Sequence, residues 1–288
     1  MKLPHFEYEA PGSLDEAIAL LVAGDGAARP IAGGQSFVPV MAFRLAEPSM
    51  LVDLRNIPGL NQIEIGAEGV RLGAMVRWRD ILDHAGLKTA LPLLPEAIEH
   101  VAHYQIRNRG TVGGSLAHAD PAAEMPTIAL TCDAVIDVVG TKGKRSIRAA
   151  DLFLGPLMTS LESDEIITSV LLPAWPATRR WGFQEFSRRR GDFALAGVAA
   201  FYDVDASGVA QNAHFGAISV GDTPLRLTKA EAAINGRKID DAVIADAAAA
   251  ASAEVDPNGD IHASARYRKA LVGTLLSRAL NAAANRKA

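Results

Sequence analysis

The stretch Gln105–Glu124, QIRNRGTVGGSLAHADPAAE, constrains the fold of this 288-residue chain more than any other segment. Glycines at this density let a backbone turn sharply and bring its N–H groups close to a ligand. Hydroxyl and guanidinium groups stand beside them. The residues concerned are Gly110, Gly113, Gly114, Thr111, Ser115, Arg107 and Arg109. We therefore expect a loop here that binds an anionic group such as a phosphate or pyrophosphate.

A second segment of the same character lies earlier in the chain, at Ile31–Ser36, IAGGQS. Two Gly-Gly-polar loops would suit a nucleotide cofactor with two phosphates. Neither is a G-x-G-x-x-G after a strand or a G-x-x-x-x-G-K-[ST], so the dinucleotide Rossmann and P-loop motifs are absent. From the residues alone two interpretations stay open, a nucleotide site or a pair of tight turns.

Composition excludes several classes of protein. The net charge of −4 argues against a general nucleic-acid-binding protein. No apolar run reaches the length of a membrane span, and the N-terminus has no signal-peptide core, so we expect a cytoplasmic protein. Cys132 is the single cysteine, and its apolar surroundings suggest a core residue. An iron–sulfur cluster or a cysteine-ligated zinc would therefore have to belong to another chain.

The hydrophobic patterns predict mixed α and β structure up to a Pro-rich linker at residues 173–178. A helix is expected at Ser13–Ala23 with Ser13 as N-cap, and a shorter one at Phe37–Leu45. After the linker, three or four apolar strands precede three Ala-rich helices. This order predicts an antiparallel sheet with helices packed on one face.

The motifs AGGQS (residues 32–36) and TVGGSLAHADPAAE (residues 111–124), in this order, resemble the FAD-binding medium subunit of the molybdenum hydroxylases, the flavoprotein of the xanthine dehydrogenase and carbon monoxide dehydrogenase family. The segments FEYEAPGSLDEAIALL, LVDLRNIPGL and RRRGDFALAGVAA extend the resemblance over essentially the whole chain. Within the family, the AGGQS and SLAHADPAAE forms resemble subunits of N-heterocycle or aldehyde oxidoreductases more than those that oxidise carbon monoxide.

This resemblance implies an α+β fold in three parts. Residues 1–57 and 58–176 would be the two subdomains of an FAD-binding fold of the PCMH/VAO type. Residues 177–288 would be a C-terminal domain of the CO dehydrogenase flavoprotein type, an antiparallel sheet with packed helices.

The resemblance also implies which residues contact FAD. The first glycine segment would bind the pyrophosphate through backbone N–H groups and the Ser36 hydroxyl, and the second would complete the site. Glu124 would lie near the adenosine ribose and Leu161 against the flavin. The expected cofactor contacts are Ala32, Gly33, Gly34, Gln35, Ser36, Val101, Thr111, Gly113, Gly114, Ser115, Glu124, Leu161, Ser187 and Phe193.

The segment Arg188–Phe193 departs from the family pattern. By composition, three consecutive arginines form a solvated charge run. In the family the segment approaches the isoalloxazine, often with Tyr or Trp at the position of Phe193. Phe193 would keep the stacking but lose any polar contact. Several relatives carry a lysine near Ser187, and the arginines could substitute for its charge.

Two other types of site are set aside. His100, His103, His118, Asp120 and Glu124 suggest a metal site, but their spacing matches no zinc pattern and no cysteine supports it. We expect Asp120 instead to cap a helix that begins at Pro121. Neither Ser36 nor Ser115 lies in the G-x-S-x-G turn of a hydrolase nucleophile.

The function implied is electron transfer by an oxidoreductase subunit that has no catalytic acid or base of its own. FAD would receive electrons from two [2Fe–2S] clusters in a small partner subunit, while a large molybdopterin subunit oxidises the substrate. The electrons would pass to NAD, a quinone or another acceptor, and the family norm is a dimer of heterotrimers. The alternatives are a stand-alone FAD oxidoreductase and a non-catalytic nucleotide-binding module, which would be colourless.

Overall fold

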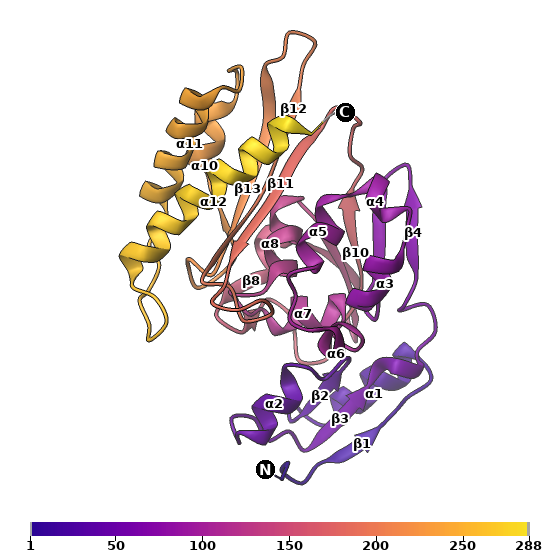
Figure 1. Cartoon of the computed structure of the whole chain (residues 1–288). Coiled ribbons are helices and arrows are strands. Elements are labelled where there is room, and N and C mark those ends of the chain that lie inside the picture. The colour runs from indigo at the N-terminus through magenta and orange to yellow at the C-terminus, as the bar shows by residue number, and fades with distance from the viewer. Residues whose placement is uncertain (1, 287–288) are drawn as a thin grey trace.

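The computed structural model describes residues 2–286, which form three main sheets and one short hairpin. The N-terminal elements lie at the lower end of the molecule in Figure 1, and the C-terminal helices form its upper left side. None of the helices in this range combines the length and apolar character needed to cross a bilayer. The mixed architecture confirms the expected α+β class.

The N-terminal unit is a three-stranded parallel sheet in the order β1-β3-β2. Its elements are β1 (Glu7–Glu9), α1 (Leu14–Ala23), β2 (Ala28–Ile31), α2 (Phe37–Ala42), β3 (Met50–Asp53) and the 3-10 helix η1 (Leu54–Asn56). The Ser13 hydroxyl accepts a hydrogen bond from the Glu16 N–H at 3.2 Å, so α1 has the expected N-cap. Helix α2 ends before the expected Leu45, because Arg44 takes a left-handed conformation with φ 61°.

The second unit is a five-stranded antiparallel sheet in the order β4-β5-β10-β6-β7. Its strands are β4 (Ile63–Gly66), β5 (Gly69–Gly73), β6 (Val135–Gly140), β7 (Gly143–Arg148) and β10 (Ile166–Pro173). Seven short helices and a hairpin connect them: α3 (Trp78–Asp83), α4 (Leu87–Ala90), α5 (Leu93–Ile98), α6 (Tyr104–Arg107), α7 (Val112–His118), α8 (Glu124–Thr131), α9 (Ala149–Leu152), β8 (Phe153–Gly155) and β9 (Met158–Thr159). Cys132 lies buried in the core between them, as expected for a small apolar residue.

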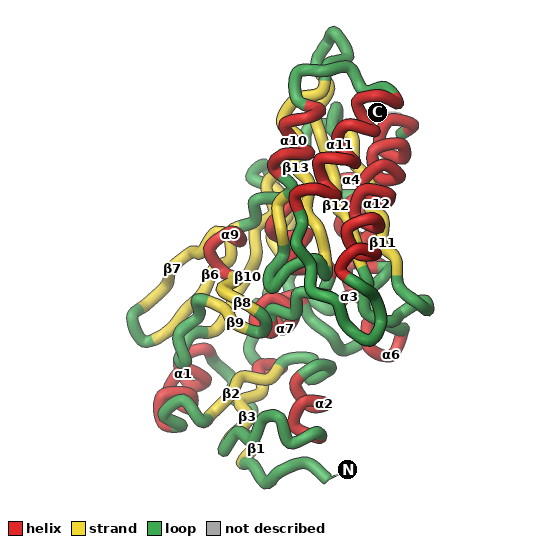
Figure 2. Tube along the Cα trace, turned by 90° about the vertical axis from the view of Figure 1, so that its left-hand side faces the viewer, coloured by secondary structure: helices red, strands yellow, loops and turns green. Residues whose placement is uncertain are grey.

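The C-terminal unit is a four-stranded antiparallel sheet in the order β11-β12-β13-β14, covered by three helices (Figure 2). The elements are β11 (Arg180–Phe186), β12 (Ala196–Val204), β13 (Ala210–Ile218), β14 (Leu225–Arg226), α10 (Thr228–Ile234), α11 (Asp241–Glu254) and α12 (Ala265–Asn285). Successive residues of a strand face opposite sides. Ala200 and Tyr202 therefore pack against the helices, while Ala199 and Phe201 join the core of the second unit. The sheet thus joins the helical layer to the second unit.

Candidate functional site

The two glycine segments, residues 32–36 and residues 110–115, come from different units and touch each other. A Cβ atom added to Gly33 would lie 2.1 Å from the carbonyl oxygen of Arg109. One added to Gly114 would lie 3.6 Å from the Cβ of Ala32. Since a real Cβ does not approach a backbone oxygen this closely, only glycine at position 33 lets the two segments meet.

The first glycine segment (residues 32–36) exposes a run of unused backbone donors between β2 and α2. Within residues 2–286, none of its five N–H groups donates a hydrogen bond to the protein. Gly34 has φ 70°, a left-handed conformation that favours glycine. The side-chain amide of Gln35 donates a hydrogen bond from Nε2 to the Gly33 carbonyl at 3.0 Å and so stabilises the turn. Several free N–H groups on one tight turn form a concave set of donors, and such a set suits an external anion.

The second glycine segment (residues 110–115) differs from our expectation, because most of it is helical rather than a loop. Thr111 is the N-cap of α7, and its hydroxyl accepts a hydrogen bond from the Gly114 N–H at 3.2 Å. The N–H groups of Val112 and Gly113 donate to carbonyls on the neighbouring β5–α3 connection, at 3.0 and 2.8 Å. These backbone donors are already used. A ligand here cannot use the N–H groups of Val112, Gly113 and Gly114, whereas the Ser115 hydroxyl is available as a side-chain donor.

Close packing explains why a helix contains two glycines. A Cβ on Gly113 would lie 2.5 Å from the Cβ of Ala74 and 2.9 Å from its carbonyl oxygen. Glycine costs about 1 kcal/mol in a helix relative to alanine. Here that cost is offset because the helix can lie directly against the chain that follows β5.

The turn after α7 also differs from our prediction. The Asp120 carboxylate accepts a hydrogen bond from the Ala122 N–H at 2.9 Å, and α8 begins at Glu124 with Ala123 as N-cap. Asp120 therefore stabilises a turn and does not cap a helix that starts at Pro121. The Pro121 carbonyl instead accepts a hydrogen bond from Ser219 of the C-terminal unit, at 2.9 Å.

Glu124 is half-buried at the start of α8, where it lies within electrostatic reach of a buried acid. Burial raises the pKa of Glu124 to about 7, and the charge of Asp120 adds to the rise. The second acid is Glu185 on β11, whose side chain is 3% exposed. Burial raises the pKa of Glu185 to about 9, with a further contribution from the charge of Glu124.

Glu185 lines a cavity of about 270 Å³ between the 99–103 and 187–193 loops. His100 also lines it, with its Nδ1 3.9 Å from Glu185 Oε1 and its ring centroid 5.0 Å from that of Phe183. Our sequence reasoning missed Glu185. The alternation of the strand could have identified it, because Glu185 is two residues after the buried Phe183 and therefore points to the same inward face of the sheet.

Of the remaining predicted contacts, Ser187 lines this cavity, and its hydroxyl donates to the Arg189 carbonyl at 2.8 Å. Phe193 is 73% exposed, which is unusual for so large an apolar ring. Val101 is almost buried, and its carbonyl accepts a hydrogen bond from Arg107 at 2.8 Å. Leu161 packs on the core of the second unit, a cluster that also contains Val101.

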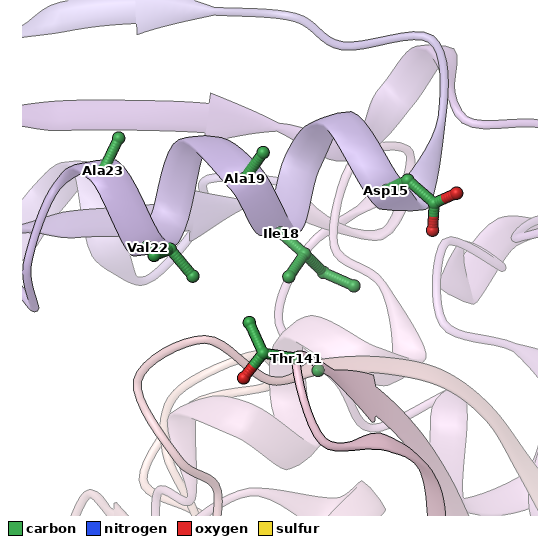
Figure 3. A pocket seen from close by; sticks show the side chains of 7 residues that line it. Asp15, Ile18, Ala19, Val22, Ala23 and Thr141 are labelled. Carbon is green, nitrogen blue, oxygen red and sulfur yellow. The ribbon is translucent and has the colours of Figure 1, made fainter.

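A separate hollow of about 520 Å³ lies between α1 and the turn at Gly140–Thr141. Figure 3 shows Ile18 and Val22 pointing from α1 toward Thr141. Its only charged lining group is the acidic Asp15, so it does not suit an anionic cofactor. Across residues 2–286, no group of three or more His, Cys, Asp or Glu side chains is arranged to hold a metal ion.

Comparisons with known proteins cover the whole chain. Residues 4–175 match the family model described as "FAD binding domain in molybdopterin dehydrogenase". Residues 181–283 match the "CO dehydrogenase flavoprotein C-terminal domain". The nicotine 6-hydroxylase medium subunit of Paenarthrobacter nicotinovorans is 42% identical over 97% of this chain and 98% of that protein.

Two solved structures are also similar throughout. A carbon monoxide dehydrogenase structure from Hydrogenophaga pseudoflava matches with a TM-score of 0.96 and 37% identity, covering 100% of both chains. Quinoline 2-oxidoreductase from Pseudomonas putida 86 matches with a TM-score of 0.94 and 40% identity, covering 99% of this chain and 98% of that one. The resemblance read from the sequence is confirmed.

Proposed function

Since the chain belongs to the family of FAD-binding medium subunits of molybdenum hydroxylases, we propose that its two glycine segments hold FAD and that it works in a three-subunit complex. The family makes it an oxidoreductase subunit with an electron-transfer role. The main observation behind the proposed site is that the N–H groups of residues 32–36 donate to no group within residues 2–286.

The first glycine segment (residues 32–36) would bind the pyrophosphate. Five N–H dipoles on one short segment can share the charge of a pyrophosphate without a fixed cation, and they are in place before the ligand arrives. The Ser36 and Ser115 hydroxyls would add side-chain donors on either side. Thr111, Gly113 and Gly114 would act mainly by holding α7 against the first segment.

The other end of the cofactor would extend toward the cavity beside Glu185. Val101, Glu124, Leu161, Ser187 and Phe193 are the residues we assign to it. The exposed ring of Phe193 supports a stacking role, because burial against a ligand would remove its contact with water. Bound FAD supplies the redox chemistry, while the chain supplies binding, orientation and electrostatic tuning.

We assign the partners by family. They are a small subunit with two [2Fe–2S] clusters and a large molybdopterin subunit, in a cytoplasmic dimer of heterotrimers. NAD, a quinone or another carrier would accept the electrons. We also propose the domain division 1–57, 58–176 and 177–288. An N-heteroaromatic substrate is favoured for the complex, because the medium subunit of nicotine 6-hydroxylase and the matched chain of quinoline 2-oxidoreductase are 42% and 40% identical to this chain.

Native purification tests this proposal. The chain should carry a flavin absorbance spectrum and co-purify with two further chains that contribute iron–sulfur absorbance. Flavin without companion chains would indicate a stand-alone oxidoreductase instead. A colourless chain that takes up no FAD, even with its partners present, would contradict the proposal.

A further inference from the structure

Glu185 is a buried acid without a partner. Its side chain is 3% exposed, and its Oε2 forms no hydrogen bond with the described residues. The nearest basic group is His100, whose Nδ1 is 3.9 Å from Oε1, beyond hydrogen-bond distance. An unpaired buried carboxylate is costly, so a carboxyl in this position favours its neutral form.

The charges around Glu185 reinforce that preference. The titratable and charged groups that face it or its cavity are Glu124, Asp120, Glu99, His100, His103 and Arg190. Of the three acids, only Glu124 contributes to the raised pKa of Glu185, while Asp120 acts on Glu124 and Glu99 is exposed to water. Arg190 is permanently cationic but exposed, and burial lowers the pKa of His100, so both compensate poorly. The Glu124 and Glu185 pair therefore retains a proton at neutral pH.

Two chain segments lead from the glycine segments to this cavity. Residues 100–109 run from His100, on the cavity wall, to Arg109, whose carbonyl meets Gly33. Residues 115–124 run from the second glycine segment to Glu124. This continuity is our reason for placing the far end of a long cofactor, anchored by its pyrophosphate at residues 32–36, beside Glu185.

We propose that Glu185 is a binding residue for the far end of the cofactor: its neutral carboxyl donates a hydrogen bond to an acceptor oxygen of FAD, with Glu124 as the neighbouring acid that keeps the proton on the pair. This inference rests on the proposed FAD site. A neutral carboxyl has one O–H donor, whereas a carboxylate only accepts. The flavin carbonyl and ribityl oxygens are suitable acceptors. Rotation about the last side-chain bond of Glu185 can turn either oxygen toward the cavity.

The test is the pH dependence of FAD affinity, measured by quenching of flavin fluorescence when FAD is added to the full-length FAD-free chain. As pH rises, ionised Glu185 loses its donor and repels the anionic cofactor. Because each unit above the pKa of the free site weakens binding up to tenfold, the wild-type Kd should rise about tenfold between pH 7 and pH 10. Glu185→Gln keeps a neutral donor at every pH, so its Kd should stay within about twofold over this range.

Two further variants isolate the effect. Glu99→Gln removes an exposed acid from the rim of the same cavity and should leave the wild-type pH dependence unchanged. Glu124→Gln removes the charge that opposes ionisation of Glu185, so the rise in Kd should begin at lower pH. An equal rise in wild type and Glu185→Gln, or a flat wild-type curve, would overturn the inference.

A measurement without FAD separates this inference from the proposed function. Infrared spectra of the FAD-free chain at pH 8 should contain the C=O stretching band of a protonated carboxyl, and Glu185→Gln should remove it. Absence of that band from the wild type refutes the neutral acid, whatever FAD does. Failure of the wild-type chain to bind FAD at any pH, with the band present, would instead refute the proposed site.

Discussion

The two glycine segments look alike in sequence but differ in the structure in how their backbone N–H groups are hydrogen-bonded. At residues 32–36 no N–H group has a protein partner within the described chain. At residues 112–115 the N–H groups donate to Val76, Ala74 and Thr111. In the first segment, glycine permits a left-handed backbone conformation and leaves the N–H groups accessible. In the second segment, glycine allows the helix to pack closely against the neighbouring chain. A Gly-Gly pair therefore marks a place where a side chain is excluded, without saying what replaces it.

The first prediction tests the contact between the two segments. Gly33→Ala places a Cβ 2.1 Å from the Arg109 carbonyl oxygen, so the segments must separate. We expect FAD affinity to fall by about 100-fold or more, equivalent to about 3 kcal/mol, in fluorescence titrations of the FAD-free chain. Gly66→Ala is the matched control, because nothing lies within 4 Å of its added Cβ. Normal FAD binding by Gly33→Ala would show that the contact is dispensable.

The second prediction concerns packing under α7. Gly113→Ala brings a Cβ to 2.9 Å from the Ala74 carbonyl oxygen. Overpacking of this kind costs about 1–3 kcal/mol, partly offset by the better helix propensity of alanine. Urea unfolding of the FAD-free chain should therefore show a net loss of up to about 2 kcal/mol. Wild-type stability combined with lost FAD binding would reverse the roles given to the two segments.

The third prediction removes the N-cap of α7. Thr111→Val keeps the shape of the side chain but loses the hydroxyl that accepts from the Gly114 N–H. The stability of the FAD-free chain should fall by about 1 kcal/mol in the same urea experiment. Thr111→Ser retains the hydroxyl and should stay close to wild type, and an equal loss in both variants would exclude capping as the cause.

The fourth and smallest effect is expected at Ser115. Its hydroxyl forms no hydrogen bond within residues 2–286, so it is free to bind a ligand. Ser115→Ala should weaken FAD binding about twofold to tenfold, the value of one hydrogen bond. Unfolding free energy should change by less than about 0.5 kcal/mol. A larger loss of stability would assign Ser115 to the structure of α7 instead.

Local patterns predicted much of the fold. The Ser13 cap, the strands of the C-terminal sheet and the three Ala-rich helices all appear, because capping and hydrophobic periodicity are encoded within a few residues. The resemblance added the family, which the comparisons confirm. Physical reasoning alone had left the glycine segments undecided between turns and a ligand site.

The predictions that were wrong or incomplete concerned features that depend on contacts between residues distant in sequence. Helix α7 forms across two glycines because Gly113 packs on Ala74, a residue 39 positions earlier in the chain. The Asp120 turn is held partly by Ser219, from another unit. Glu185 becomes a buried acid only when β11 packs on the second unit and brings it near Glu124. Patterns within a short stretch of sequence therefore could not predict these three features.

Hydrogen exchange at the backbone amides of both glycine segments tests the central claim most directly. With and without FAD, the amides of residues 112–115 should be protected alike, because their hydrogen bonds already exist in the protein. The amides of residues 32–36 should exchange rapidly without FAD and slowly with it. Rapid exchange at residues 32–36 in the FAD-bound chain would contradict the assignment of the pyrophosphate to this segment.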